Sequence, residues 1–127
     1  MNIKSTFKKI IILDIILGII IIVSSLFQPE EIMNLNLSLF PISDGLAIFY
    51  LVIMLIWLVN DFLLYNFKKI AKQIFLILFI ISIIFSFFHG GGVYTSTLYL
   101  LDGLAWTFNG VILVFLYFTP IKKEFDK

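Results

Sequence analysis

Four long apolar stretches follow one another along this chain of 127 residues, and short polar segments separate them. About 20 apolar residues span the hydrocarbon core of a bilayer as a helix, because hydrocarbon offers no partner to an unpaired backbone group. The four stretches cover about residues 10–27, 44–65, 72–88 and 98–118. The sequence therefore predicts a single domain, an all-α integral membrane protein built as a bundle of four transmembrane helices.

The lysines indicate how these helices cross the membrane. All nine basic residues are lysines, and they form three groups, within residues 4–9, 68–72 and 122–127. The two remaining connections, residues 28–43 and 89–97, contain no lysine. Lysines beside membrane spans are retained in the cytoplasm. The pattern therefore predicts cytoplasmic N and C termini, in what we expect to be a bacterial cytoplasmic (inner) membrane.

Composition excludes several classes of protein. Charged residues make up 13% of the chain, against about 25% in soluble proteins. Lysines beside membrane spans act as headgroup anchors, so we expect the lipid bilayer as a partner and no binding of nucleic acid. The absence of cysteine excludes disulfides and cysteine metal sites.

The first apolar stretch has a second interpretation, as the core of a secretory signal peptide. Its length of about 18 residues is long for such a core. The residues at its end, Ser24, Ser25, Leu26 and Phe27, contain no clear small-x-small cleavage site. We therefore expect an intact first helix.

Two short motifs suggest an internal duplication. The tetrad FKKI at residues 7–10 recurs at 67–70, and DGLA at residues 44–47 recurs at 102–105. The two halves would be parallel 2+2 repeats, because each begins and ends in the cytoplasm. Coincidence in a chain rich in Ile, Leu, Phe and Lys explains the motifs as well, so both interpretations stay open.

Polar residues near the cytoplasmic ends of the first two stretches form one candidate group. Asp14 lies in the first stretch, and Asn60 and Asp61 lie near the end of the second. Lys9 and Lys68 are close to them in the sequence. A charge inside a membrane is costly unless it is paired, so the sequence predicts an inner belt of ion pairs that anchors the helices.

A second candidate group lies near the outer surface and consists of Asp44, His89, Asp102 and Asn109. A helix that begins near residue 98 embeds the Asp102 carboxylate about one turn inside the membrane, with Asn109 deeper on the same face. A helix that begins at Asp102 would instead use it as a cap, the role expected for Asp44. Histidine has an unperturbed pKa of about 6.5, so these residues are candidates for a polar cavity or for proton exchange.

Residues 28–43 form the one sizeable segment outside the membrane. Leu35, Leu37 and Leu39 alternate there with asparagine and serine. An amphipathic helix on the membrane surface and a short extended stretch both fit this pattern. In either form the segment could cover the outer polar residues as a lid, or bind a protein partner.

The sequence contains no complete set of catalytic groups. His89 is the one histidine, and no serine stands in a nucleophile elbow. The glycines at residues 90–92 lack the lysine of a phosphate-binding loop, and one histidine with two carboxylates makes a poor metal site. We therefore expect no enzyme, no cofactor and no metal.

Two hypotheses about function follow. The first is an accessory, interaction or protective membrane subunit that binds a protein partner or a second copy of itself. The alternative is a small transporter or channel-forming subunit with an outward-facing polar cavity lined by Asp102, His89 and Asp44. An enzyme that acts on a lipid or a quinone is a third and weaker hypothesis. In hydropathy and size the layout resembles small bacterial four-helix inner-membrane proteins, including the DoxX-like group.

Overall fold

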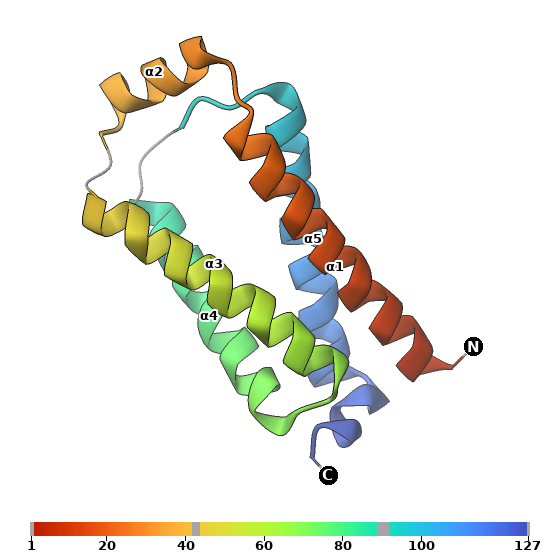
Figure 1. The fold of residues 1–127 in the computed structure, drawn as a ribbon. Helices are drawn as coiled ribbons and strands as arrows, with labels where there is room; N and C mark the ends of the chain where they lie inside the picture. The colour runs from red at the N-terminus through yellow and green to blue at the C-terminus, as the bar shows by residue number, and fades with distance from the viewer. Residues whose placement is uncertain (1, 42–43, 89–91, 127) are drawn as a thin grey trace.

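The computed structural model describes residues 2–41, 44–88 and 92–126, and these are helical with no strand. The elements are α1 (Ile3–Leu26), α2 (Glu30–Leu39), α3 (Asp44–Tyr65), α4 (Lys69–Phe88), α5 (Ser96–Phe118) and the 3-10 helix η1 (Pro120–Glu124) (Figure 1). Among these, α1, α3, α4 and α5 are long and apolar enough to cross a membrane. The prediction of an all-α protein with four such helices is confirmed.

Two membrane helices extend further than their apolar residues alone predict. α1 begins at Ile3 rather than near residue 10, because the Asn2 side chain caps it by accepting a hydrogen bond from the Lys4 amide at 3.1 Å. α4 begins at Lys69 rather than near residue 72. Lysine is a good helix former, so the lysine groups continue the helices beyond the apolar stretches.

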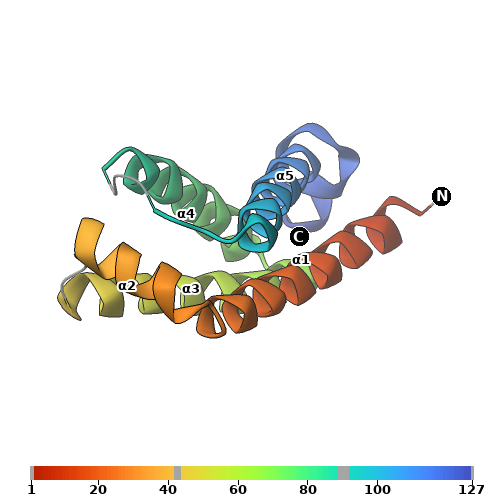
Figure 2. The same ribbon diagram turned by 90° about the horizontal axis from the view of Figure 1, so that it is seen from above.

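The four long helices form a bundle that is open along one seam. α1 packs most extensively against α5 and α3, and α3 packs against α4, whereas α4 and α5 have little contact. Both views show α4 and α5 diverging towards the end of the molecule that carries α2 (Figures 1 and 2). We call this end the α2 end. The first turn of α1, the α3–α4 turn and η1 lie together at the opposite end, the terminal end (Figure 1).

An aromatic core closes the terminal end. Phe7 of α1 is fully buried, and its ring centroid lies 5.8 Å from those of Phe67 and Phe115 and 5.9 Å from that of Phe125. η1 covers this core, because it turns the chain back and brings Phe125 underneath the helices. The Lys4 ammonium and the Glu124 carboxylate form an ion pair at 2.7 Å across the same surface.

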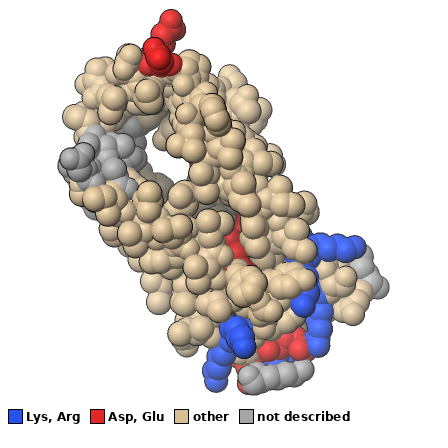
Figure 3. Space-filling model, in the orientation of Figure 1, with Lys and Arg blue, Asp and Glu red and all other residues tan. Residues whose placement is uncertain are grey.

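The visible lysines gather at one end of the molecule, whereas acidic residues lie at both ends (Figure 3). The lysines visible in Figure 3 lie at the terminal end, and an acidic patch lies at the α2 end. Glu30 and Glu31 in the first turn of α2 supply that patch. Their position also suits the helix dipole, which favours negative charge at a helix start.

Candidate functional site

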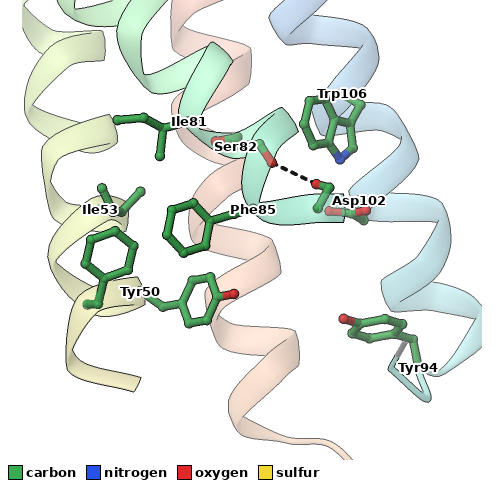
Figure 4. A pocket seen from close by; sticks show the side chains of 10 residues that line it. Tyr50, Ile53, Ile81, Ser82, Phe85, Tyr94, Asp102 and Trp106 are labelled. Carbon is green, nitrogen blue, oxygen red and sulfur yellow. Dashed lines mark hydrogen bonds between the residues drawn. The ribbon is translucent and has the colours of Figure 1, made fainter. Parts of the chain in front are cut away.

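A cavity of about 310 Å³ lies at the α2 end between α3, α4 and α5 (Figure 4). We call it the acidic cavity, because Asp102 supplies the carboxylate among its lining residues. The lining residues are Phe49, Tyr50 and Ile53 of α3, Ile81, Ser82, Phe85 and Ser86 of α4, Tyr94 of the α4–α5 connection, and Asp102 and Trp106 of α5.

The cavity exists because α4 and α5 are held by different neighbours. Phe49 and Phe85 stack with ring centroids 5.0 Å apart, which holds the upper half of α4 against α3. α5 packs instead along α1. α4 and α5 diverge towards this end, and the space between them forms the acidic cavity, which their side chains line.

The structure places Asp102 inside α5 and not at its start. α5 begins at Ser96, and the Thr95 hydroxyl caps it by accepting a hydrogen bond from the Leu98 amide at 3.2 Å. Asp102 therefore lies about 9 Å along the helix axis from the first residue. The interpretation of Asp102 as a cap is wrong: it lies inside the helix with an exposed side chain, and its depth in a membrane stays a prediction.

Two features make an embedded carboxylate tolerable at this position. The indole nitrogen of Trp106, one turn further along α5, lies beside it (Figure 4). The acidic cavity also gives it space for water, and Asp102 lines a second cavity of about 320 Å³ on the α1 side of α5. A charged group inside a membrane costs a few kcal/mol when it is neither paired nor hydrated, and both features would lower that cost.

The other predicted members of the outer group are not assembled around Asp102. Asn109 does not line the acidic cavity, and its half-buried side chain has an Oδ1 atom without a hydrogen-bond partner. Asp44 is the first residue of α3, and its side chain lies outside the described part of the structure. His89 lies outside the described residues altogether. Proton exchange between His89 and the carboxylates therefore stays a prediction.

Several cavity residues were not predicted as site residues. Ser82 and Ser86 are spaced by four, which places them on one helix face and was a usable signal. The Ser86 hydroxyl donates to the Ser82 carbonyl oxygen at 2.8 Å. Tyr50 and Tyr94 point towards one another across the cavity, from α3 and from the α4–α5 connection (Figure 4). No sequence pattern indicates Tyr94, because its position depends on the path of the connection.

Helix α2 fixes that path through a two-bond clamp. The Asn36 amide donates to the Val93 carbonyl oxygen at 2.7 Å, and the Val93 amide donates to the Asn36 Oδ1 atom, also at 2.7 Å. A Cβ atom at the adjacent Gly92 would lie 2.7 Å from the Tyr94 hydroxyl oxygen, so a larger residue there would require the Tyr94 ring to shift. The segment before α3 is thus an amphipathic helix and not an extended stretch, and it holds Tyr94 at the acidic cavity.

Replacing Asn36 with alanine should detach α2 from the α4–α5 connection. Both hydrogen bonds are lost and the Val93 backbone groups are left without partners, so we expect a loss of about 1–3 kcal/mol in the free energy of unfolding. Hydrogen exchange at Val93 should also become faster. The matched control is Asn34→Ala on the exposed face of α2, which should change neither quantity. Equal exchange at Val93 in the two variants would contradict the clamp.

The predicted inner belt of ion pairs is wrong. Asp14, Asn60 and Asp61 are buried where α1 meets α3, with exposed fractions of 9%, 1% and 4%. Among the described residues neither carboxylate forms an ion pair, and Lys9 and Lys68 are exposed. The lysine side chains reach water at the terminal end, whereas the carboxylates point into the helix interface.

The buried polar group at the α1–α3 interface instead contains unsatisfied atoms. Asp61 Oδ1 and both amide atoms of Asn60 have no hydrogen-bond partner. Asp14 acts on Asp61 as a like charge across the interface. Burial away from water is the main effect that disfavours charge on Asp61, and a charge on Asp14 adds to it.

Comparisons with known proteins identify no relative. The chain matches no family model, and neither the curated proteins nor the solved structures contain a match. Within the described residues, no three His, Asp or Glu side chains converge as metal ligands. The function of the acidic cavity has to follow from its own shape and charge.

Proposed function

We propose that this protein is a non-enzymatic subunit of the bacterial cytoplasmic membrane that takes up a small solute through the acidic cavity. The observation that carries the proposal is the Asp102 carboxylate, which lies in a cavity of about 310 Å³ where two membrane helices diverge. A concave, mostly apolar site with a few convergent polar groups is the usual form of a small-molecule site.

The proposed orientation places the acidic cavity on the outer side of the membrane. The lysine groups lie beside the turns and helix ends at the terminal end, which the positive-inside rule assigns to the cytoplasm. The α2 end then faces outwards, with Glu30 and Glu31 at the surface. A solute would meet Asp102 first, and Asn109 lies about 10 Å deeper along α5.

The proposal is tested by permeability of liposomes that contain the purified protein. Proton flux is followed with entrapped pyranine, and entry of urea and glycerol is followed by liposome swelling. We expect at least one flux well above that of empty liposomes, and we expect Asp102→Asn to reduce it about tenfold or more, because the carboxylate at the cavity wall is lost. The control is Glu31→Gln, which removes a carboxylate at the same end but outside the cavity.

The accessory hypothesis rests on a different observation, the apolar surface of α2. Met33, Leu35, Leu37 and Leu39 are between 44% and 59% exposed. Met33 and Leu37 are one turn apart on one side of α2, and Leu35 and Leu39 are one turn apart on another. These exposed apolar side chains beside two glutamates suit a protein partner or a second copy as well as a membrane surface. If this hypothesis holds, Leu37→Glu should abolish co-purification of a partner, while Asp102→Asn leaves it intact and the liposomes show no flux in any variant.

A further inference from the structure

The walls of the acidic cavity are aromatic. Tyr50 lies edge-to-face against Phe85 with ring centroids 6.2 Å apart, and Phe85 stacks on Phe49 at 5.0 Å. On the opposite side, Trp106 lies edge-to-face against Phe79 at 6.0 Å, so packing fixes its ring beside Asp102. Aromatic faces carry negative electrostatic potential and attract cations that come within about 6 Å.

The charge around the acidic cavity has one sign. Its lining contains the Asp102 carboxylate and no lysine. The lysines visible in Figure 3 lie at the opposite end of the molecule, and Glu30 and Glu31 add negative charge at the α2 end. A cavity lined by one sign of charge with low-dielectric walls concentrates ions of the opposite sign.

We propose that the acidic cavity binds an organic cation, an ammonium group carried on a small apolar or aromatic body. This inference rests on the proposed function and names its ligand class. The ammonium group would lie against the Asp102 carboxylate and the Trp106 ring, and the apolar body would pack among Phe49, Phe85 and Ile81. The charged part of the ligand would thus contact the carboxylate and an aromatic face, and the apolar part would contact apolar side chains.

Other ligand classes fit this lining less well. A metal ion needs several oxygen ligands, and within the described residues no three acidic or histidine side chains converge. A sugar needs many convergent hydrogen-bonding groups. Here the Ser86 hydroxyl hydrogen is already donated to the Ser82 carbonyl, and most of the remaining walls are rings or aliphatic chains.

The volume of about 310 Å³ is at the lower end of the range for ligand pockets, roughly 300–1,000 Å³, and favours a compact cation.

The two tryptophans of the chain provide the measurement. Trp106 lines the acidic cavity, whereas Trp57 packs edge-to-face on Phe75 at 5.2 Å and lines none of it. In the Trp57→Phe variant, Trp106 is the one remaining tryptophan, so tryptophan fluorescence comes from the acidic cavity alone. The probes are benzyltrimethylammonium, its neutral carbon isostere neopentylbenzene, and glucose. Each is titrated into the protein in lipid nanodiscs.

We expect benzyltrimethylammonium to change Trp106 fluorescence saturably and the neutral isostere to bind at least tenfold more weakly. Asp102→Asn should weaken binding of the cation at least tenfold, Asp102→Glu should retain it within about threefold, and Glu31→Gln should leave it unchanged. The pair of Asp102 variants separates charge from folding, because both alter the same position and only one keeps the carboxylate.

The outcomes distinguish this inference from the proposed function. Equal affinity for the cation and the neutral isostere, or unchanged affinity in Asp102→Asn, would overturn the organic-cation inference while leaving a cavity that binds solutes. Saturable binding of glucose that depends on Asp102, without binding of the cation, would do the same. If none of the three probes gives a saturable signal and the liposomes show no flux, both proposals are wrong.

Discussion

Phe7→Ala should lower the free energy of unfolding by about 3–5 kcal/mol, the largest loss of stability we expect from a single substitution. Phe7 is fully buried among Phe67, Phe115 and Phe125, and no neighbour can fill the space that alanine would leave. This core lies at the terminal end, where the lysines gather, and lysines beside membrane spans mark the boundary with water. The hydrophobic effect therefore acts on it, in contrast to helix contacts surrounded by lipid.

The measurement is equilibrium unfolding in mixed micelles with increasing sodium dodecyl sulfate. Phe27→Ala is the control, since Phe27 follows the other end of the same helix and is 80% exposed. We expect the control to change the free energy of unfolding by less than about 0.5 kcal/mol. A loss of less than 1 kcal/mol in Phe7→Ala, comparable to that of Phe27→Ala, would show that the aromatic core does not hold the terminal end together.

Asp61→Asn should have the opposite effect and raise the free energy of unfolding by about 1–3 kcal/mol. Asparagine keeps the shape of the side chain and removes its charge. Asp61 is 4% exposed, one of its oxygens has no hydrogen-bond partner, and Asp14 faces it as a like charge. Removing either charge relieves the same repulsion, so Asp14→Asn should also stabilise the protein, and the double variant should gain less than the sum of the two.

The same unfolding assay checks this pair of variants. Asp126→Asn serves as the control, because Asp126 is an exposed carboxylate near the chain end and should be neutral within about 0.5 kcal/mol. A loss of stability in Asp61→Asn, or strict additivity in the double variant, would mean that the two carboxylates do not repel each other. A stabilised variant that also loses flux would assign this pair to the transport path.

The helices were predictable because their signals are local. Long apolar stretches define the spans, and Asn2 and Thr95 stand where helix starts need a capping side chain. The prediction that α5 starts close to residue 98, with Asp102 inside the helix, followed from span length alone and is confirmed. The lysines visible in Figure 3 lie at one end of the molecule, and the orientation of that end in the membrane stays a prediction.

The acidic cavity and the buried carboxylate pair were not predictable, because they depend on how the helices are rotated and tilted. Sequence position shows that Asp14 and Asp61 lie near the same ends of their helices as the neighbouring lysines. It does not show which face of α1 packs against α3. The divergence of α4 from α5 follows from aromatic contacts of Phe49 with Phe85, between helices whose sequences show no sign of that pairing.

The internal duplication stays a prediction, and its two motifs lie in different local structures. Phe7 lies in the second turn of α1, whereas Phe67 lies in the α3–α4 turn with a φ of 53°. Asp44 is the first residue of α3, whereas Asp102 lies inside α5. Helix α2 also has no counterpart between α4 and α5 among the described residues.

The most direct test of an outward-facing, hydrated cavity is chemical labelling of a cysteine at position 82. The chain has no cysteine, so Ser82→Cys places a single small thiol in the cavity wall. Intact cells are treated with 2-(trimethylammonium)ethyl methanethiosulfonate, which does not cross the membrane, and Ile77→Cys on the exposed face of α4 is the control. We expect labelling of Ser82→Cys from outside and none of Ile77→Cys. Failure of Ser82→Cys to react from outside, or reaction only in inverted vesicles, would show that the acidic cavity does not face outwards.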